Sequence, residues 1–363
     1  MEEIQYRDFS LKLHQKKWQK KNPVVAQFEL TFGCNMHCRH CYSNCYNNSE
    51  YLKRELNTKE VIDILDKLYK EGIFWLCFTG GDPLKREDFI EIYSYAKKKG
   101  FIITVFTNAA LIDKKIADYF KRFPPFCIEI TLNAVTEKIY EEISQVKGSF
   151  KLALNGIENL IKRDISLKIK TQATKQNYQE LDAIKEFIEK RGLKFRVSAI
   201  LNACLNGDLT PVTLRLSPKK VLEINERFRL NSMQEDEMPN IKFSTDVANQ
   251  PPSDNLFRCA IGLDTFHITP TGEMILCTLV REPSINLLDT TASIQESHNR
   301  LLSEIRNKKF KTNSKCKTCL YWYLCSWCPG RAKLEIADEE APLSYFCKLT
   351  HLVVDLERER VDK

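Results

Sequence analysis

The chain has 363 residues, of which 43% are hydrophobic and 28% are charged, and it carries a formal net charge of +7. This length supports a large core and predicts more than one domain. The positive charge is spread through short lysine runs, which favours a solvated surface over a nucleic-acid site. The chain opens without an apolar signal core, and no apolar run reaches the roughly 18 residues of a membrane span. We therefore expect a cytoplasmic protein with no nucleic-acid or membrane partner.

Short apolar runs alternate with longer amphipathic stretches between residues 24 and 200, as in a series of βα units. The runs predict strands over 24–30, 74–79, 102–107, 126–132, 167–174 and 195–200. The amphipathic stretches predict helices over 58–72, 86–100, 112–123, 152–164 and 177–192. Six units are too few for an eight-fold barrel, so we predict an α/β fold with a partial (βα)6 barrel. In such folds the chemistry lies at the C-terminal ends of the strands.

The pattern changes after residue 200. Residues 201–218 predict a loop, 219–230 a helix, and the polar, proline-containing stretch that follows an irregular linker. Two strands are predicted around a turn at Thr271 and Gly272, within a cysteine-rich α+β extension. We therefore divide the chain into an N-terminal extension, a barrel core, a linker and a C-terminal extension, over residues 1–23, 24–205, 206–256 and 257–363.

Three cysteines, Cys34, Cys38 and Cys41, follow the first predicted strand. In a reducing compartment, clustered cysteines bind metal or perform chemistry more often than they form disulfides. Zinc sites commonly combine two pairs of ligands, and the spacing CxxxCxxC does not provide such pairs. Three thiolates on one tight loop suit three corners of a [4Fe–4S] cluster and leave the fourth iron without a cysteine. An iron left open in this way can chelate a small molecule.

The segment CNMHCRHC, followed by Tyr42, resembles the cysteine motif of the radical S-adenosylmethionine (radical SAM) superfamily. The resemblance implies that a [4Fe–4S] cluster on these cysteines chelates S-adenosyl-L-methionine (SAM) through its open iron. An electron from the cluster then cleaves SAM to methionine and a 5′-deoxyadenosyl radical. The same resemblance implies an electron donor of the flavodoxin or ferredoxin type.

Other segments extend the resemblance. The second predicted strand ends in FTGGDP, which is similar to the family's GGE motif for the methionine amine of SAM through Gly80, Gly81 and Asp82. Thr131, in the TLNA segment after the fourth strand, corresponds to a residue near the ribose or carboxylate of SAM, and His40 to an aromatic residue near the adenine. Relatives often carry an arginine for the SAM carboxylate after the next helix, where this chain offers only Lys147 as a substitute.

A second set of cysteines resembles the SPASM extension of radical SAM enzymes, which holds two auxiliary Fe–S clusters, here expected to be [4Fe–4S]. By position, one cluster would receive Cys316, Cys319, Cys325 and Cys347. The other would receive only Cys259, Cys277 and Cys328. The resemblance thus leads to the hypothesis that this inner cluster has an open iron for a substrate thiolate or amide. Taken alone, the two CxxC pairs between residues 316 and 328 also fit a zinc ribbon.

Four cysteines remain outside these sets. Cys77 and Cys127 lie in apolar strands and are predicted to be core residues. Cys204 is interpreted as a loop thiol, although its place after the last barrel strand also allows it to face the site. Cys45 is interpreted as a thiol without a ligand role, because the family uses three cysteines.

The commonest task of enzymes with this domain pair is oxidative modification of a ribosomal peptide or protein, such as thioether formation or another crosslink. Only 23 residues precede the first predicted strand. We therefore expect a leader peptide to be recognised by a separate protein or by another surface.

Three alternatives stay open at this stage. Anaerobic sulfatase maturation is less favoured, because such enzymes carry a carboxylate where this chain has Thr278. Tetrapyrrole side-chain modification is supported by the segment NPVVAQFELTFGCNMHCRHCYS, which is similar to haem-biosynthetic members. A non-catalytic Fe–S carrier is the alternative from another class, and the GGDP segment and the open iron argue against it.

Overall fold

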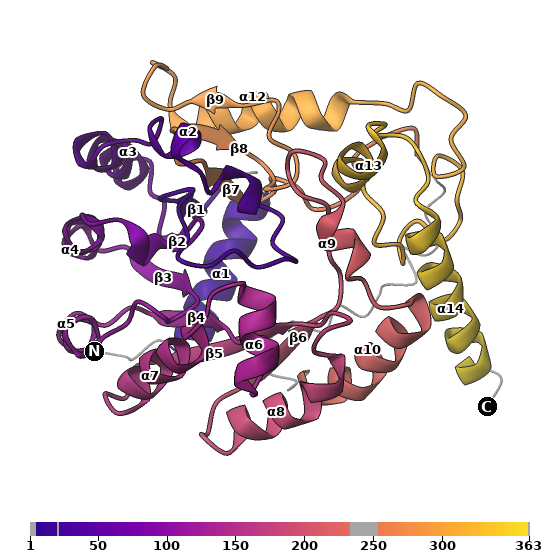
Figure 1. Cartoon of the computed structure of the whole chain (residues 1–363). Coiled ribbons are helices and arrows are strands. Elements are labelled where there is room, and N and C mark those ends of the chain that lie inside the picture. The colour runs from indigo at the N-terminus through magenta and orange to yellow at the C-terminus, as the bar shows by residue number, and fades with distance from the viewer. Residues whose placement is uncertain (1–4, 20–21, 233–252, 362–363) are drawn as a thin grey trace.

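One sheet organises the molecule. The computed structural model describes residues 5–19, 22–232 and 253–361, and within these ranges nine strands form a sheet in the order β6-β5-β4-β3-β2-β1-β7-β8-β9. Strands β1 to β6 are parallel, which confirms the six predicted strands (Figure 1). Their bounds are Val25–Glu29, Trp75–Thr79, Ile102–Thr107, Cys127–Thr131, Leu167–Gln172 and Phe195–Ser198.

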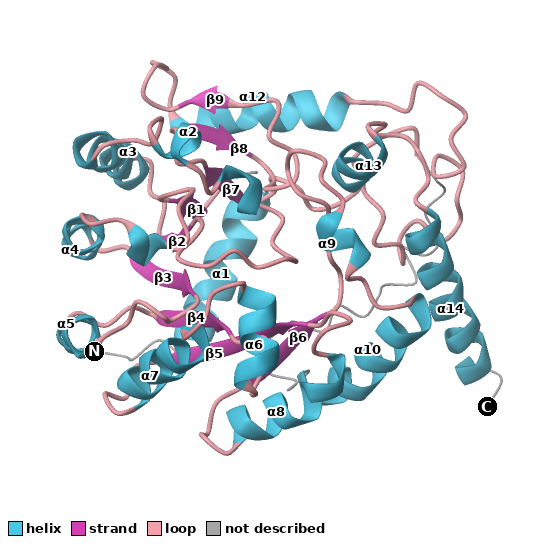
Figure 2. Cartoon of the chain, in the orientation of Figure 1, coloured by secondary structure: helices cyan, strands magenta, loops and turns pink. Residues whose placement is uncertain are grey.

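The helices that alternate with these strands lie on the outer side of the sheet (Figure 2). The five predicted helices are confirmed as α3, α4, α5, α7 and α8, with bounds Thr58–Lys70, Phe89–Lys99, Lys114–Arg122, Ser149–Ile161 and Leu181–Glu189. Between β1 and β6, the helical segments that were not predicted are η1 Asn44–Tyr46, α2 Ser49–Leu52, η2 Pro83–Lys85 and α6 Glu137–Ser144. The turn η3 Tyr178–Glu180 lies within the helix predicted over 177–192. The α/β class and the partial barrel are therefore confirmed.

Helix α3 illustrates why these segments are helical. Asn57 and Glu60 form a capping box in which each side chain accepts a hydrogen bond from the other residue's backbone N–H. Four residues at helical spacing then turn inward and are buried: Val61, Ile64, Leu65 and Leu68. Helix α4 ends as predicted at Gly100, whose φ of 92° lies in the left-handed region.

The C-terminal extension joins the same sheet. Strand β7 (Thr265–Ile268) pairs in parallel with β1, and β8 (Glu273–Ile275) and β9 (Ile285–Asn286) continue the sheet in antiparallel order. The two strands predicted around Thr271 and Gly272 are therefore confirmed, but their pairing with the barrel was not predicted. Three further helices follow, α12 Ile294–Asn307, α13 Pro329–Ile336 and α14 Ser344–Val361.

Two other segments differ from the prediction. Residues 201–218, predicted as loop, contain the short helix α9 (Thr210–Thr213), because Asp208 accepts hydrogen bonds from the backbone and the hydroxyl of Thr210. The helix predicted over 219–230 is α10 (Pro218–Ser232), which packs against α14. Residues 233–252 of the predicted linker lie outside the described residues.

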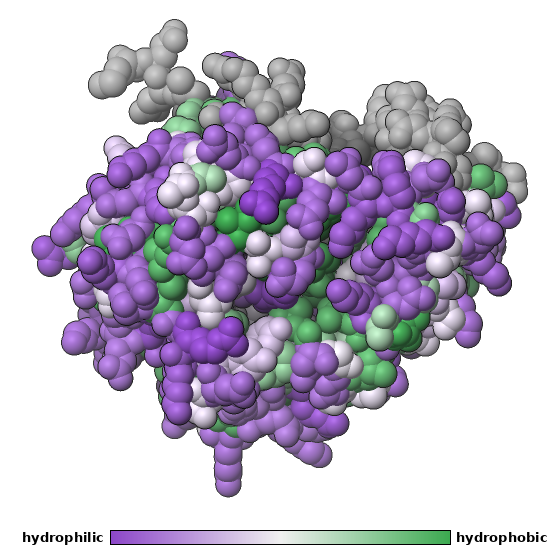
Figure 3. Space-filling view, turned by 90° about the horizontal axis from the view of Figure 1, so that it is seen from above, coloured by the Kyte–Doolittle hydropathy of each residue, from purple (hydrophilic) through white to green (hydrophobic). Residues whose placement is uncertain are grey.

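Helix α1 (Tyr6–Gln19) packs against the N-terminal end of β2 and the segment that precedes β7. The Trp75 indole donates to the Tyr6 hydroxyl at 2.8 Å, and the His14 ring lies 3.1 Å from the Asp264 carboxylate. Figure 3 shows mostly hydrophilic residues, with small hydrophobic patches, on the face that it presents. None of the described helices is both long and apolar enough to cross a membrane.

Gly156 of α7 provides a test of this packing. A Cβ atom at residue 156 would lie 2.0 Å from the Ala109 carbonyl oxygen, in the loop after β3. We therefore expect Gly156→Ala to lower the free energy of unfolding by about 1–3 kcal/mol, because the helix must move away from that loop. Lys151→Ala, at an exposed position of the same helix, should stay within about 0.5 kcal/mol. Chemical denaturation of both variants measures the difference, and equal stability would contradict the close approach.

Candidate active site

A cavity of about 630 Å³ lies at the C-terminal ends of the six parallel strands. This volume is within the range that holds a drug-sized ligand. The residues that follow or end successive strands line it, among them Thr31, Gly81, Asn108, Thr131, Gln172 and Ser198. Most of the predicted cofactor residues also line it, namely Cys34, Cys38, Cys41, His40, Gly80, Gly81 and Thr131.

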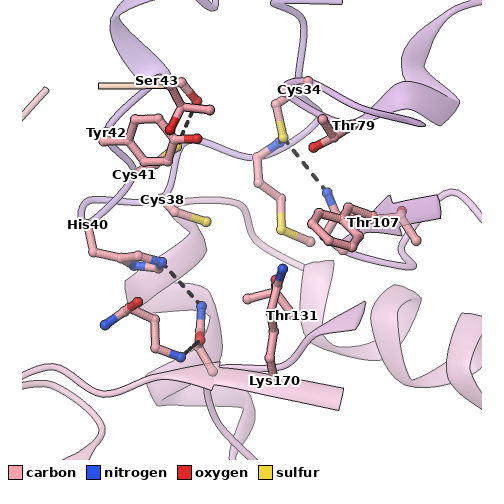
Figure 4. A pocket seen from close by; sticks show the side chains of 18 of the residues that line it. Cys34, Cys38, His40, Cys41, Tyr42, Ser43, Thr79, Thr107, Thr131 and Lys170 are labelled. Atoms are coloured by element: carbon pink, nitrogen blue, oxygen red, sulfur yellow. Dashed lines mark hydrogen bonds between the residues drawn. The ribbon is translucent and has the colours of Figure 1, made fainter. Parts of the chain in front are cut away.

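The three cysteines of the first loop lie close to one another on the cavity wall (Figure 4). Burial, and then the charges of Asp82 and Cys41, raise the pKa of the Cys34 thiol to about 12. Burial, and then the charges of Cys41 and Cys34, also raise the pKa of Cys38 well above its usual range. Three adjacent, partly buried thiolates are unfavourable without a positive partner, and a bound iron cluster would supply one. The residues present therefore fit a cluster.

No three His, Cys, Asp or Glu side chains of the described residues converge as ligands of a single metal ion.

The side chain of Asn47 holds the cysteine loop in shape. Its Oδ1 accepts from the Cys34 N–H at 3.1 Å, and its Nδ2 donates to the carbonyls of Cys34 and Met36 at 3.1 and 3.3 Å. The loop is also fixed from α6, because the His37 N–H donates to the Ser144 carbonyl at 2.9 Å. These contacts satisfy backbone groups that a loop would otherwise leave unpaired.

Cys45 and Cys204 lie beside this loop but do not line the cavity. The Cys204 thiol donates to the Cys41 carbonyl at 3.4 Å, and the Cys45 thiol is 3.9 Å from the Tyr42 carbonyl. All fourteen cysteines fall within the described ranges, and each is a free thiol. Cys77 and Cys127 are buried in strands, as predicted.

Gly80 and Gly81 lie where two backbone segments meet. A Cβ atom at Gly80 would lie 2.3 Å from the Thr31 carbonyl oxygen, and one at Gly81 would lie 2.3 Å from that of Gly33. The Gly81 N–H donates to the Thr31 carbonyl at 2.8 Å. Glycine is therefore required here by the loop after β1, in addition to any contact with a ligand.

Asp82 is fully buried and is absent from the cavity wall. Its carboxylate accepts hydrogen bonds from the Thr107 hydroxyl at 2.8 Å, the Asn108 N–H at 2.9 Å and the Leu84 N–H at 3.1 Å. Burial outweighs these hydrogen bonds and raises the pKa of Asp82 to about 6. The side chain therefore supports the loop after β3 and does not face the cavity.

The opposite wall carries Thr131 and Lys170, and His40 lines the cavity from the cysteine loop itself (Figure 4). Burial lowers the pKa of His40 to about 4, so the imidazole is neutral near pH 7. Its Nδ1 atom is buried and has no hydrogen-bond partner within the described chain. Thr131 is paired in register with Lys170 of β5. The Lys170 ammonium is 2.7 Å from Glu129 and 3.9 Å from the centre of the Phe106 ring.

Lys170 was missed by sequence reasoning, although the alternating pattern of β5 places it on the inner face of the barrel. Lys147, the predicted substitute for an arginine, is exposed and does not line the cavity.

Sequence reasoning also missed an ion pair that joins the barrel core to the C-terminal extension. Arg281, beyond β8, forms two hydrogen bonds of 2.8 and 3.0 Å with the carboxylate of Glu29 in β1. The Tyr42 hydroxyl is buried beside this pair and hydrogen-bonds the Thr278 side chain. Burial, and then the charge of Glu29, raise the pKa of Tyr42 above its usual range.

The charges of neighbouring cysteines act on cysteines of the extension. Burial, and then the charges of Cys328 and Cys259, raise the pKa of Cys277. Burial, and then the charges of Cys347, Cys325 and Cys319, raise the pKa of Cys316 to about 11. The division of these cysteines between two auxiliary clusters stays a prediction.

Comparison with known proteins shows which sequences and folds this chain resembles. Residues 28–190 match the profile of the Radical SAM superfamily. Fe-coproporphyrin III synthase of Methanosarcina barkeri is 31% identical over 170 residues, which cover 47% of this chain and 42% of the relative. Mycofactocin maturase MftC of Mycolicibacterium smegmatis is 28% identical over 179 residues, which cover 49% of this chain and 45% of the relative. The chain thus matches less than half the length of these curated relatives.

Solved structures share the fold over most of the chain. Streptococcus suis SuiB bound to precursor peptide SuiA has a TM-score of 0.66 at 17% identity, covering 92% of this chain and 78% of SuiB. The structure of anSMEcpe with AdoMet and the Kp18Cys peptide has a TM-score of 0.67 at 16% identity, covering 93% of this chain and 98% of that chain. Residues 28–190 therefore form a domain of the Radical SAM superfamily, and the chain shares its fold with these two solved structures.

Proposed function

We propose that the chain is a radical SAM enzyme that cleaves SAM reductively and oxidatively modifies a peptide or protein. The observation that carries this proposal is that three cysteines share one wall of a cavity that no fourth cysteine of the chain lines. Three cysteine ligands leave one iron open for SAM. The chain's own part is to orient and enclose the reactants, while the cofactor supplies the difficult chemistry.

In this proposal Cys34, Cys38 and Cys41 hold a [4Fe–4S] cluster, which supplies the electron that cleaves SAM. The backbone at Gly80 and Gly81 lies beside the cysteines and offers carbonyl groups to the methionine amine. The remaining contacts come from Lys170, which provides a cation near Thr131 on the opposite wall, and from His40, which provides a neutral ring on the cysteine loop.

The cavity favours a side chain of a polypeptide as the second reactant. After SAM is bound, a volume of about 630 Å³ leaves room for a side chain more readily than for a whole tetrapyrrole. The names of MftC, a maturase, and of SuiB bound to its precursor peptide support the same class.

Tetrapyrrole modification is the second candidate, because the relative that is 31% identical is named Fe-coproporphyrin III synthase. Sulfatase maturation has less support, since Thr278 follows Cys277 where a carboxylate is expected. We further propose that the extension carries two auxiliary clusters, that a flavodoxin or ferredoxin supplies electrons, and that the enzyme works in the reducing cytoplasm.

The core of the proposal predicts SAM cleavage. Anaerobically reconstituted protein with dithionite and SAM should release 5′-deoxyadenosine, measured by liquid chromatography. Cys34→Ala should reduce release to the level without protein, because a cluster with two cysteines does not persist.

Cys45→Ser is the matched control on the same loop, and it should retain the activity because its thiol does not line the cavity. Equal loss in both variants would assign Cys45 as a ligand and leave SAM without an iron. Failure of the unaltered protein to cleave SAM would support the Fe–S carrier instead.

The proposal of two auxiliary clusters predicts how the bound iron is divided within the protein. The double variant Cys316→Ala with Cys319→Ala should lose about one third of the bound iron, because it leaves one of three clusters of equal size with only two cysteines. The measurement is iron and sulfide analysis together with Mössbauer spectroscopy of the reconstituted protein. Cys77→Ala, at a buried strand position, should keep the full content. Retention of all the iron by the double variant, with zinc found in the unaltered protein, would support the zinc ribbon.

The substrate class is tested by mass spectrometry of the two candidate reactants. Short peptides encoded beside the gene should lose the mass of two hydrogens when incubated with reduced enzyme and SAM. Coproporphyrin III and its iron complex should remain unchanged. Decarboxylation of either tetrapyrrole, with unchanged peptides, would replace the proposed substrate by the second candidate.

A further inference from the structure

Asn108, in the loop after β3, directs its side-chain amide at the first cysteine loop. Its Nδ2 atom donates to Asn35 Oδ1 at 2.7 Å and is 3.8 Å from Cys34 Sγ, a contact within hydrogen-bond range for sulfur. Figure 4 draws this second contact as a dashed line from Cys34. The Met36 backbone N–H is 3.4 Å from the same sulfur. Cys34 therefore accepts from two N–H donors.

The position of Asn108 is fixed at its backbone and at both ends of its amide. Its backbone N–H donates to the buried carboxylate of Asp82 at 2.9 Å, and its Oδ1 accepts from the Ala110 N–H at 2.9 Å. The Asp82 carboxylate also accepts from the Thr107 hydroxyl at 2.8 Å. These contacts leave the amide little freedom, so its N–H groups remain aimed at Cys34 and Asn35.

We propose that Asn108 raises the reduction potential of the cluster on Cys34, Cys38 and Cys41 by donating a hydrogen bond to the Cys34 sulfur, and that Asp82 is its positioning residue. The proposal rests on the [4Fe–4S] cluster of the proposed function. Reduction adds negative charge to a cluster and its thiolates, and a hydrogen bond to a sulfur stabilises the more negative state. Asn108 thus makes an otherwise anionic, buried site easier to reduce.

Asp82 acts on the potential in two opposite ways. Its carboxylate holds Asn108 in place, and its own charge acts on Cys34. A buried negative charge near the cluster disfavours an added electron. The hydrogen-bond donor and the carboxylate therefore oppose each other at the same sulfur, and variants of the two residues should shift the potential in opposite directions.

The test is a redox titration of the reconstituted protein, followed by EPR in mildly alkaline buffer without SAM. The signal of the first cluster is identified as the one missing from Cys34→Ala. Asn108→Leu keeps the side-chain size and removes the donor. At the potential that half-reduces the unaltered cluster, we expect the reduced-to-oxidised ratio in Asn108→Leu to fall several-fold, up to the tenfold change that equals 59 mV for one electron. Asp82→Asn keeps a side-chain oxygen that accepts from the Asn108 N–H and removes the negative charge, so it should raise that ratio.

Asn47→Ala is the matched control. Asn47 hydrogen-bonds the backbone of Cys34 and Met36 and lies 3.5 Å from the His37 imidazole, whereas the hydrogen bonds of the described residues to the Cys34 sulfur come from Met36 and Asn108. This variant should lower the melting temperature and leave the potential unchanged. An equal shift in Asn47→Ala and Asn108→Leu would mean that loosening of the loop sets the potential, which would overturn the proposal.

Asn108 also lines the cavity, so a contact with SAM is the competing role. Equilibrium binding of SAM to the same variants separates the two. Weaker SAM binding by Asn108→Leu with an unchanged potential would overturn the proposal. A lower potential in Asn108→Leu with a higher one in Asp82→Asn supports it. Absence of any cluster signal from the unaltered protein would instead refute the proposed function, so the two failures are distinguishable.

Discussion

The close approach of two backbone segments, residues 31–33 after β1 and Gly80–Gly81 after β2, determines the geometry of the site. Any side chain on either glycine would overlap a carbonyl oxygen of the other segment. Hydrogen bonds from Gly81 to Thr31 and from Asp82 to Gly33 fix the contact. Because Cys34 follows this segment directly, the same contact sets where the cysteine loop begins and how close it lies to the ends of β2 and β3.

Burial of negative charge is the second constraint on the site. Thiols at Cys34 and Cys38 have raised pKa values because they lie out of water and near other acids. Two carboxylates of the cavity wall, Glu29 and Glu129, are each paired with a basic side chain. The chain thus neutralises its carboxylates internally and leaves the thiolates for a metal cluster, which is the expected division where a cofactor carries positive charge.

Local patterns were sufficient for most of the fold. The six parallel strands and their helices could be predicted from short apolar runs and capping signals. Helix α12 could have been predicted in the same way, because Ser293 and Glu296 form a capping box that is visible in the sequence. The roles of Lys170 and of the pair Glu29–Arg281 could not be predicted from the sequence. These roles depend on contacts between segments that are far apart in the chain. The orientation of Asp82 was hidden for the same reason: the sequence reveals the motif, while the burial of its carboxylate depends on Thr107 and Asn108.

The pairing of β7 with β1 has consequences for the chemistry of the whole molecule. It places the extension's first hairpin beside the strand that leads into the cysteine loop. Cys41 is followed by Tyr42, whose hydroxyl hydrogen-bonds Thr278, the residue after Cys277. On the other side, Arg331 donates its backbone N–H to the Cys328 sulfur at 3.4 Å and its side chain to Asn202 of the cavity wall at 2.8 Å. Short hydrogen-bonded paths therefore link Cys277 and Cys328 of the extension to the cysteine loop and to the cavity wall.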